Sequence, residues 1–366
     1  MDMKKYVPEW VLSLTPYQPG KPIEELEREY GIHNSIKIAS NENPLGPSPK
    51  AVAAITAALP KLHLYPDSDV FYLKKRLAEK LGVERSQLIV GNGSNELIEM
   101  IVRTFLRIGE SIVVGEHSFA IYHLASSAAG GRTIRVPHKG FQFDLAAMAD
   151  AIESDTRIVF LDNPNNPTGT IYTRSDWQAF LQRVPNTVLI VVDEAYFEFV
   201  ANKEGINSLD WLKTNPNLII TRTFSKAYGL AGLRIGYGLS SPEIADILNR
   251  VRQPFNNNML ALVAAEAALS DEEYLHQTIA VNAQGMSDLT AGFKALDLEW
   301  IPSAGNFVSV DLKQPGQPIY EALLRKGVIV RPVANYGLPN HLRISIGTQA
   351  ENRFFLKVFA ETLNNV

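Results

Sequence analysis

Short apolar runs recur along the middle of the chain and alternate with segments whose apolar residues have helical spacing. Runs that are apolar throughout are typical of strands buried on both faces of a parallel sheet. Because helices separate the runs, the pattern predicts an α/β fold in which helices cover both faces of a mostly parallel sheet. The predicted strands are 88–90, 111–114, 132–136, 157–161, 188–192 and 218–220, and the predicted helices include 49–59, 70–80, 97–106 and 144–152.

The two ends of the chain differ from this middle part. Residues 1–50 are rich in proline, which disfavours long helices and favours an extended arm. After helices predicted at 242–252, 259–270 and 271–296, short strands alternate with helices as far as the last residues. We therefore expect an arm (1–50) that contributes to the functional site, a large ligand-binding domain (51–285) and a smaller α+β domain (286–366).

Composition excludes several classes of protein. The chain of 366 residues is longer than one compact core normally holds, and its net charge of −4 does not favour nucleic acid or an anionic membrane surface as a partner. Cysteine is absent, so disulfides, thiolate nucleophiles and cysteine-ligated metals are excluded. No apolar run approaches the roughly 20 residues that cross a bilayer, and the first residues lack the apolar core of a signal peptide. We expect a cytoplasmic protein without a membrane partner.

The stretch around Lys226 carries the most distinctive chemistry. Thr223 and Ser225 precede this lysine at the end of the strand predicted at 218–220, and Arg234 follows eight residues later. A lysine amine can form a Schiff base with a carbonyl, and a guanidinium group fits a phosphate at two points. The stretch therefore predicts a nucleophilic lysine beside a phosphate site. The alternative is a strand end with a surface lysine and a structural arginine.

A second phosphate signal follows the strand 88–90. The segment 91–96 reads Gly-Asn-Gly-Ser-Asn-Glu and leads into a predicted helix. At such a helix start, free backbone N–H groups and the positive end of the helix dipole face the same position and can bind an anion there. A dinucleotide site is an alternative, although Glu96 replaces the third glycine of that fingerprint. A simple helix cap by Ser94 or Asn95 is compatible with either interpretation.

Two further strands end in polar residues. The loop 162–170 contains two prolines and three asparagines, and Asp193 follows the most apolar run of the chain. A carboxylate at a buried strand end is costly unless it meets a cation, and ligands bind at the carboxyl ends of the strands in open α/β sheets. A helix cap and a metal ligand are alternatives for Asp193, but no histidine cluster or second carboxylate at metal-site spacing accompanies it. We therefore expect no metal.

Together these segments resemble the fold-type-I pyridoxal-phosphate aminotransferases, and most of all the histidinol-phosphate aminotransferase family. The resemblance extends from about residue 14 to about residue 348. It implies pyridoxal 5'-phosphate as cofactor, small-molecule substrates and a homodimer. It also implies that Lys226 holds the cofactor as an internal aldimine and later moves the substrate's proton.

The resemblance assigns the other cofactor contacts. Asp193 would keep the ring nitrogen protonated, which makes the ring an electron sink. Asn166 and Tyr196 would hydrogen-bond the ring oxygen, and Phe119 would stack on the ring. Many members have tyrosine in place of Phe119; stacking needs only the aromatic face, but a hydroxyl contact is lost. The implied phosphate contacts are Gly93, Ser94, Asn95, Thr223, Ser225 and Arg234, with Tyr65 supplied by the partner subunit.

The implied substrate contacts come from the arm and the C-terminal part of the chain. Tyr17 and Asn43 lie in proline-rich motifs of the arm. Arg343 interrupts an apolar strand, so it either faces solvent or is directed at an anion. By resemblance it clamps the substrate α-carboxylate with help from Asn306, while Arg331 is the candidate for the distal group, a phosphate in histidinol phosphate.

The reaction implied is histidinol phosphate plus 2-oxoglutarate giving imidazole-acetol phosphate plus glutamate, a step of histidine biosynthesis. An aromatic amino acid or prephenate aminotransferase is the nearest alternative. A phosphothreonine-type decarboxylase would use the same cofactor site but would produce no oxoacid. A catalytically idle module of a DNA-binding regulator is the least favoured interpretation, because the family motifs begin by Leu14 and the net charge is acidic.

Overall fold

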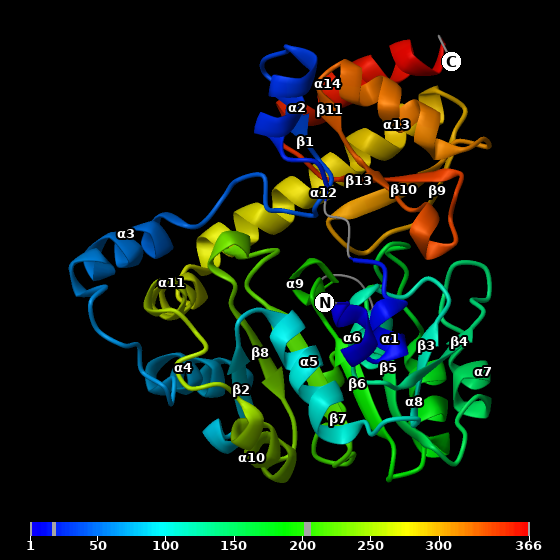
Figure 1. Ribbon diagram of the computed structural model, residues 1–366. Coiled ribbons are helices and arrows are strands. Elements are labelled where there is room, and N and C mark those ends of the chain that lie inside the picture. The colour runs from blue at the N-terminus through cyan, green and yellow to red at the C-terminus, as the bar shows by residue number, and fades with distance from the viewer. Residues whose placement is uncertain (1, 17–19, 201–205, 365–366) are drawn as a thin grey trace.

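The computed structural model describes residues 2–16, 20–200 and 206–364. A large α/β part lies below a smaller α+β part in Figure 1, and the long helix α12 (Glu272–Ala295) runs between them. The predicted boundary at residue 285 falls inside α12, which contacts α9 (Phe197–Val200) of the large part as well as strands of the small part. The proposed division into domains stays a prediction.

Within the described residues, seven strands form the sheet of the large part, in the order β2-β8-β7-β6-β5-β3-β4. All neighbours are parallel except those of β8. The α/β architecture expected from the sequence is confirmed. The strands are β2 (Leu88–Gly91), β3 (Ser111–Gly115), β4 (Arg132–Val136), β5 (Thr156–Asp162), β6 (Leu189–Asp193), β7 (Leu218–Thr223) and β8 (Gly236–Leu239).

The strand β8 has no counterpart among the predicted strands. Its sequence Gly-Tyr-Gly-Leu lacks the apolar run that marks the others. A Cβ atom on Gly236 would lie 2.6 Å from the main-chain nitrogen of Ser94, so glycine is needed where β8 passes the start of α5 (Ser94–Phe105). The close approach brings Arg234, just before β8, next to that helix end.

Apolar side chains bury both faces of the sheet. One face packs against α5, α6 (Ile121–Ala128) and α10 (Pro242–Val251). The other face is covered by α3 (Pro49–Ala58), α4 (Phe71–Leu81), α7 (Leu145–Asp150), α8 (Arg174–Arg183) and α11 (Met259–Leu269). Burial on both faces explains why the strands are apolar throughout rather than alternating.

The small part contains a four-stranded antiparallel sheet, as far as the chain is described, in the order β12-β13-β10-β9. Helix α12, helix α13 (Gly316–Arg325) and helix α14 (Gln349–Leu363) surround a separate apolar core on this sheet. The strands are β9 (Glu299–Ile301), β10 (Phe307–Asp311), β12 (Arg331–Pro332) and β13 (His341–Ser345). This arrangement places β13 directly above the carboxyl ends of the large sheet.

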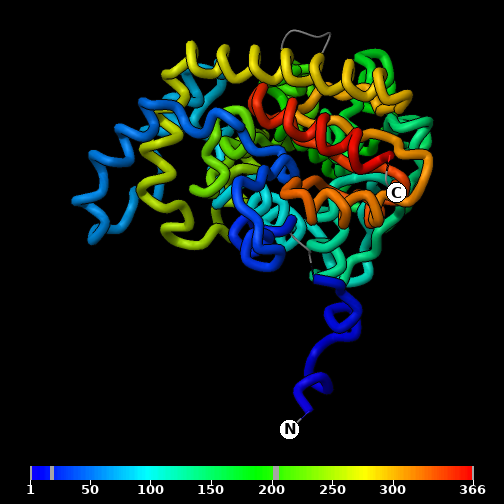
Figure 2. The backbone as a smooth tube through the Cα atoms, turned by 90° about the horizontal axis from the view of Figure 1, so that it is seen from above, coloured from blue at the N-terminus to red at the C-terminus, as the bar shows by residue number. Residues whose placement is uncertain are grey.

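The N-terminal arm is more structured than its proline content predicts. Helix α2 (Ile23–Tyr30) begins after Pro22, and its Leu26 is fully buried against Leu324 and Ile329. The next residues pair as β1 (Ile36–Lys37) with β11 (Val328–Ile329), which fixes this part of the arm to the small part. The residues of α1 (Glu9–Leu12) and those before it project from the body in Figure 2.

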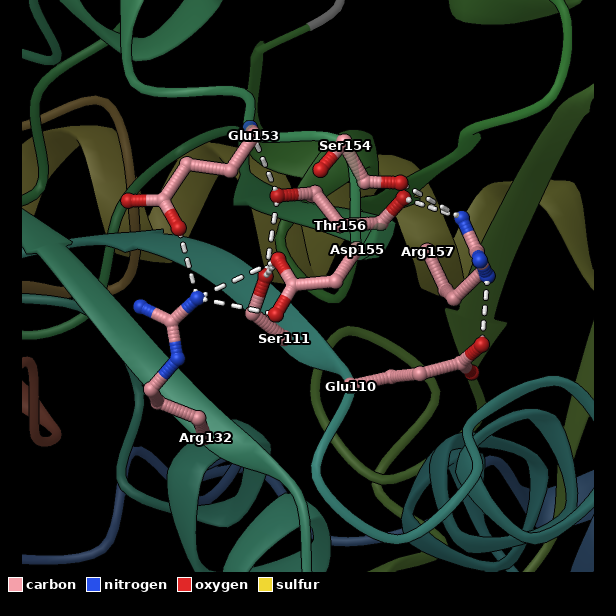
Figure 3. Close-up of polar contacts among 8 residues, drawn as sticks. All are labelled: Glu110, Ser111, Arg132, Glu153, Ser154, Asp155, Thr156 and Arg157. Carbon is pink, nitrogen blue, oxygen red and sulfur yellow. Dashed lines mark hydrogen bonds and ion pairs between the residues drawn. The ribbon is translucent and has the colours of Figure 1, made fainter.

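At the amino ends of β3, β4 and β5, charged side chains form an exposed network (Figure 3). Arg132 donates hydrogen bonds to Glu153 and Asp155, and Arg157 donates to Glu110 at 2.8 Å. Every carboxylate of the network therefore has a cation. Among the residues that the structure describes, no helix combines the length and the apolar character that crossing a bilayer requires.

Candidate active site

A cavity of about 250 Å³ lies at the carboxyl edge of the large sheet, below β13. Polar and charged side chains from the arm, from the large sheet and from the small part meet in it. The cavity is lined by Gly20, Ala39, Ser40, Asn41, Glu42, Ser94, Asn95, Phe119, Tyr122, Asp162, Asn166, Asp193, Ala195, Tyr196, Thr223, Ser225, Lys226, Ala231, Arg234, Arg331, Tyr336 and Arg343. Most of the residues singled out in the sequence are among them.

Asp193 ends β6 and is buried, with only 4% of its surface exposed. Its Oδ2 accepts a hydrogen bond of 3.1 Å from the hydroxyl of Tyr122. Its Oδ1 is buried and makes no hydrogen bond of ordinary geometry among the described residues, although the side chain of Thr221 and the main chain of Ala195 lie near the carboxylate and oppose the rise in its pKa. Burial raises the pKa of Asp193 to about 6. An unpaired carboxylate oxygen at this depth is costly, so the arrangement calls for a cationic donor in the cavity.

Asp162 ends the neighbouring strand β5 and lies in register with Asp193. Its Oδ2 accepts the main-chain N–H of Asn166 at 2.7 Å, and its Oδ1 accepts the side-chain amide of Asn165 at 3.1 Å. Burial raises the pKa of Asp162 to about 8. Asp162 therefore fixes the loop that carries Asn166. Its place at the end of a predicted strand is a local signal that marks Asp162 as a candidate.

Lys226 follows β7 and is half-buried, with its Nζ donating to the main-chain oxygen of Ser40 at 3.0 Å. Its Nζ also lies 5.8 Å from the centre of the Tyr196 ring. Burial, and then the positive charge of Arg343, lowers the pKa of Lys226 to about 8. A larger share of the amine is thus neutral, and nucleophilic, than in an exposed lysine.

One end of the cavity is a cluster of donors around Arg234. The hydroxyl of Ser225 accepts from Arg234 Nη1 at 3.4 Å and from Thr223 Oγ1 at 2.9 Å. Gly93, with φ of 81°, caps α5, and a Cβ atom there would lie 2.5 Å from Arg234 Nη2. No side chain caps this helix end, so the N–H groups that begin with Ser94 remain directed at the cluster. Such a set of donors suits a phosphate.

The opposite end of the cavity contains Arg343 from β13. Its guanidinium group is buried, donates to Asn166 Oδ1 and to the main-chain oxygen of Ala39, and lies over the ring of Phe307. The solvent-facing alternative for Arg343 is therefore wrong. Because Asn166 Oδ1 accepts from Arg343, the amide nitrogen of Asn166 is the group left to donate to a ligand. Arg331, half-buried on β12, lines the same cavity.

No group of three or more His, Cys, Asp or Glu side chains in the described residues has the arrangement of a metal site. The site is therefore built from one lowered-pKa lysine, two buried carboxyl groups, a donor cluster at one end and an arginine at the other. This geometry suits a ligand that has a carbonyl group, a basic ring nitrogen and an anionic group.

Comparisons with known proteins agree with this geometry. Residues 33–359 match the family model described as aminotransferase class I and II. A histidinol-phosphate aminotransferase of Pseudomonas fluorescens is 54% identical over 355 residues, which are 96% of this chain and 96% of that protein. One from Methylococcus capsulatus is 52% identical and covers 96% of this chain and 97% of its own length.

The chain belongs to the aminotransferase class I and II family. Among solved structures, a histidinol-phosphate aminotransferase of Sinorhizobium meliloti, in complex with pyridoxal-5'-phosphate, has a TM-score of 0.91 and 32% sequence identity, covering 97% of both chains. The family resemblance inferred from the sequence is confirmed.

In this aminotransferase fold, three described residues among the predicted site residues do not line the cavity, and a fourth, Gly93, lies just behind Arg234. Asn306 is buried with its amide nitrogen donating to the main-chain oxygen of Asn41 at 3.0 Å. Asn43 is also buried, but its amide nitrogen donates to the main-chain oxygen of Ala227. Tyr65 is 81% exposed. Tyr17 lies outside the described residues.

Among the cavity residues that were not singled out from the sequence, Asn41, Tyr122 and Asp162 make side-chain hydrogen bonds to other residues of the site. Tyr122 is buried and stacks on Phe160 with 4.8 Å between ring centres, which directs its hydroxyl at Asp193. The sequence shows Tyr122 only as one more apolar residue of α6. Its role depends on contacts with strands β5 and β6, which the local pattern does not contain.

Proposed function

We propose that the protein is a pyridoxal-phosphate-dependent aminotransferase that converts histidinol phosphate and 2-oxoglutarate to imidazole-acetol phosphate and glutamate. The observation that supports the cofactor best is the buried, unpartnered Oδ1 of Asp193 in the same cavity as Lys226. A protonated pyridine nitrogen is a cation with one donor, and it meets that requirement. The aminotransferase assignment itself follows from the family.

The remaining residues of the cavity fit the rest of the cofactor. The phosphate would lie in the donor cluster of Ser94, Asn95, Thr223, Ser225 and Arg234, at the helix end that Gly93 caps. Phe119 offers an aromatic face on the cavity wall. Asn166 and Tyr196 would donate to the ring oxygen. Burial raises the pKa of Tyr196, so its phenol stays neutral and keeps a proton to donate.

When bound, the cofactor supplies an electron sink for the bond that breaks at the substrate's α-carbon. The chain supplies the proton movements. Lys226 would hold the cofactor through its amine, and the freed amine would serve as general base and acid for the proton of the substrate's α-carbon. Its lowered pKa suits both roles near neutral pH, because a catalytic group works best when its pKa is close to the working pH.

Two arginines would hold the anionic groups of the substrates. Arg343 would clamp the α-carboxylate of glutamate. Asn306, directly before β10, stays a predicted assisting residue without support from the geometry. Arg331 would bind the distal phosphate of histidinol phosphate, because it lines the cavity from β12, beside β13. Tyr17 and Asn43 stay predicted substrate contacts without support from the geometry. The cytoplasmic location likewise stays a prediction.

We also propose a homodimer. Eight large apolar side chains with at least 41% exposure come from α3, the loop after it, the start of α4 and residue 255. Helix α3 and the chain that follows it project from one side of the molecule in Figures 1 and 2. Tyr65 stacks on Phe255 there and would reach the partner's cofactor phosphate. The side chains are Val52, Leu59, Leu62, Leu64, Tyr65, Phe71, Tyr72 and Phe255. Sedimentation should give the mass of two chains.

The substrate is tested by mixing the purified cofactor-loaded enzyme with one amino donor at a time and following the visible absorbance of the cofactor. Histidinol phosphate, histidinol, phenylalanine and glutamate form a matched set, since histidinol differs from the first only by its phosphate. We expect histidinol phosphate and glutamate to convert the cofactor and histidinol to require a much higher concentration. An equal response to histidinol and to its phosphate would remove the phosphate-binding role of Arg331. A strong response to phenylalanine would instead indicate an aromatic aminotransferase.

A further inference from the structure

Asn41 lies at a sharp bend of the arm, directly over the cavity. Its φ of 53° is in the left-handed region, which asparagine, aspartate and glycine tolerate best, and only 1% of its surface is exposed. It joins three parts of the molecule, because its hydrogen bonds reach β13 through Ser345, the segment before β10 through Asn306, and the end of β6 through Tyr196.

The hydrogen bonds of Ser345 fix which way the Asn41 amide faces. The main-chain N–H of Asn41 donates to Ser345 Oγ at 2.8 Å, so the serine proton is free to point elsewhere. Asn41 Oδ1 lies 2.9 Å from this hydroxyl and accepts that proton. If the amide were reversed, its NH₂ group would face the hydroxyl, and the serine proton would lose its acceptor.

This orientation of the Asn41 amide determines the direction in which the hydroxyl proton of Tyr196 points. Asn41 Nδ2 donates to the Tyr196 hydroxyl oxygen at 2.9 Å. An NH₂ group can only donate, so the phenol cannot direct its own proton toward Asn41. The phenol proton must then point to another acceptor, and Tyr196 lines the cavity at that point. The amide thus leaves the tyrosine as a donor toward the cavity.

We propose that Asn41 is a positioning residue that forces the Tyr196 hydroxyl to donate its proton into the cavity, toward the ring oxygen of the bound cofactor. The inference rests on the cofactor assignment of the proposed function and deepens it. It also makes the direction of this proton depend on the docking of β13 over the cavity, because Ser345 of β13 orients the Asn41 amide.

Three variants test this direction without changing the bend. Asn41→Asp replaces the donor by a carboxylate, which when ionised only accepts, so the tyrosine would donate to it instead of to the ring oxygen. Asn41→Gly keeps the left-handed backbone and removes the amide. Tyr196→Phe removes the proton itself. Thermal unfolding curves for each variant show whether the fold is kept.

The measurement is the pH at which the visible absorbance of the bound cofactor changes, without substrate. A hydrogen bond to the ionised ring oxygen lowers this pH. We expect Asn41→Asp and Tyr196→Phe each to raise it by about one unit or more, which is the effect of one hydrogen bond to a charged group. Asn41→Gly should raise it less, because the tyrosine keeps its proton.

The double variant Asn41→Asp/Tyr196→Phe separates the hydrogen bond from simple charge. We expect it to match Tyr196→Phe alone. If Asn41→Asp raises the transition pH by the same amount in the Tyr196→Phe background as in the unchanged enzyme, the aspartate acts by its charge. If Asn41→Asp alone leaves the transition pH unchanged, Asn41 has no influence on the tyrosine proton. Either result overturns the proposal. If Tyr196→Phe leaves the transition pH unchanged, the proposed contact between Tyr196 and the cofactor's ring oxygen is wrong, whatever the role of Asn41.

Discussion

The acidic side chains at the two edges of the seven-stranded sheet differ in their exposure and in their pairing with cations. At the amino edge, Arg132, Asp155 and their neighbours are exposed and paired (Figure 3), and hydrogen bonds from Arg132 lower the pKa of Asp155. At the carboxyl edge, Glu194 forms a buried ion pair with Arg222, whereas Asp162 and Asp193 are buried side by side, and no ion pair with a cation is found for either within the described ranges. Burial raises the pKa of both.

The difference indicates where a ligand, rather than a protein side chain, would supply the cation that pairs with a carboxylate. A paired, solvated carboxylate needs nothing more, whereas a buried one without a cation keeps a free-energy cost that a suitable ligand removes. Both edges carry acidic residues in the sequence. Only burial and pairing distinguish the functional edge from the structural one.

Replacing Lys226 by alanine should abolish turnover and the visible absorbance of covalently held cofactor. The physical reason is that no other amine of the described chain lines the cavity. Lys226→Arg is the matched control, because it keeps the positive charge but cannot bond to the carbonyl, and it should be equally inactive. Turnover in either variant, measured with histidinol phosphate and 2-oxoglutarate, would contradict the role of Lys226.

Asp193→Ala should lower the turnover number by about 100-fold or more, since it removes the group that holds the ring nitrogen protonated. Cofactor binding, measured by equilibrium dialysis, should weaken as well. Asp155→Ala, at the opposite edge, should leave both quantities nearly unchanged. Similar losses in the two variants would remove the functional contrast between the edges.

Arg343→Ala should raise the KM for glutamate by about 30-fold or more, because truncating one member of a buried charge pair leaves the other unpaired. The same measurement with 2-oxoglutarate should give a similar increase, since both compounds carry the carboxylate that Arg343 would clamp. A KM for glutamate equal to that of the unchanged enzyme would exclude the clamp.

The lowered pKa of Lys226 predicts a pH dependence for cofactor capture by the cofactor-free protein. The neutral amine dominates above the pKa of about 8 and falls about tenfold for each unit below it. The capture rate, followed by stopped-flow absorbance, should therefore rise with pH and level off above about pH 8. N-acetyl-lysine amide at the same pH values corrects for titration of the cofactor. A rate that keeps rising to pH 10 would indicate an ordinary lysine.

Arg132→Ala should have the smallest effect. It removes an exposed ion pair, which contributes little because water and salt screen it. We expect unchanged kinetic constants and a small decrease in Tm that disappears at high salt. A marked loss of activity in this variant would mean that the amino edge is coupled to the site.

Much of this architecture could be predicted from the chain itself. The apolar runs located five of the central strands to within one or two residues, because burial on both faces leaves a continuous local signal, whereas β7 extends three residues beyond its predicted end at residue 220. The segments around Lys226, Asp193 and Arg343 were found because charge at the end of, or inside, an apolar run is locally conspicuous. The small part was expected as well, from its short alternating elements.

The missed features depend on contacts between distant residues. Asn41 meets Ser345 across 304 positions, and its neighbour Asn43 carries the same side chain without reaching the cavity. Strand β8 is glycine-rich because of one close approach to α5, so it lacks an apolar signal. Helix α2 forms in a proline-rich arm because Leu26 finds a buried position on the small part. No local pattern contains these partners.

Lys226 is the residue proposed to bind the carbonyl of the cofactor. The most direct test is to reduce the cofactor-loaded enzyme with borohydride, digest it and locate the modified lysine by mass spectrometry. The account predicts one pyridoxyl group, on the peptide that contains Lys226, and none after reduction of Lys226→Ala. A pyridoxyl group on another lysine, or none on the unchanged enzyme, would contradict it.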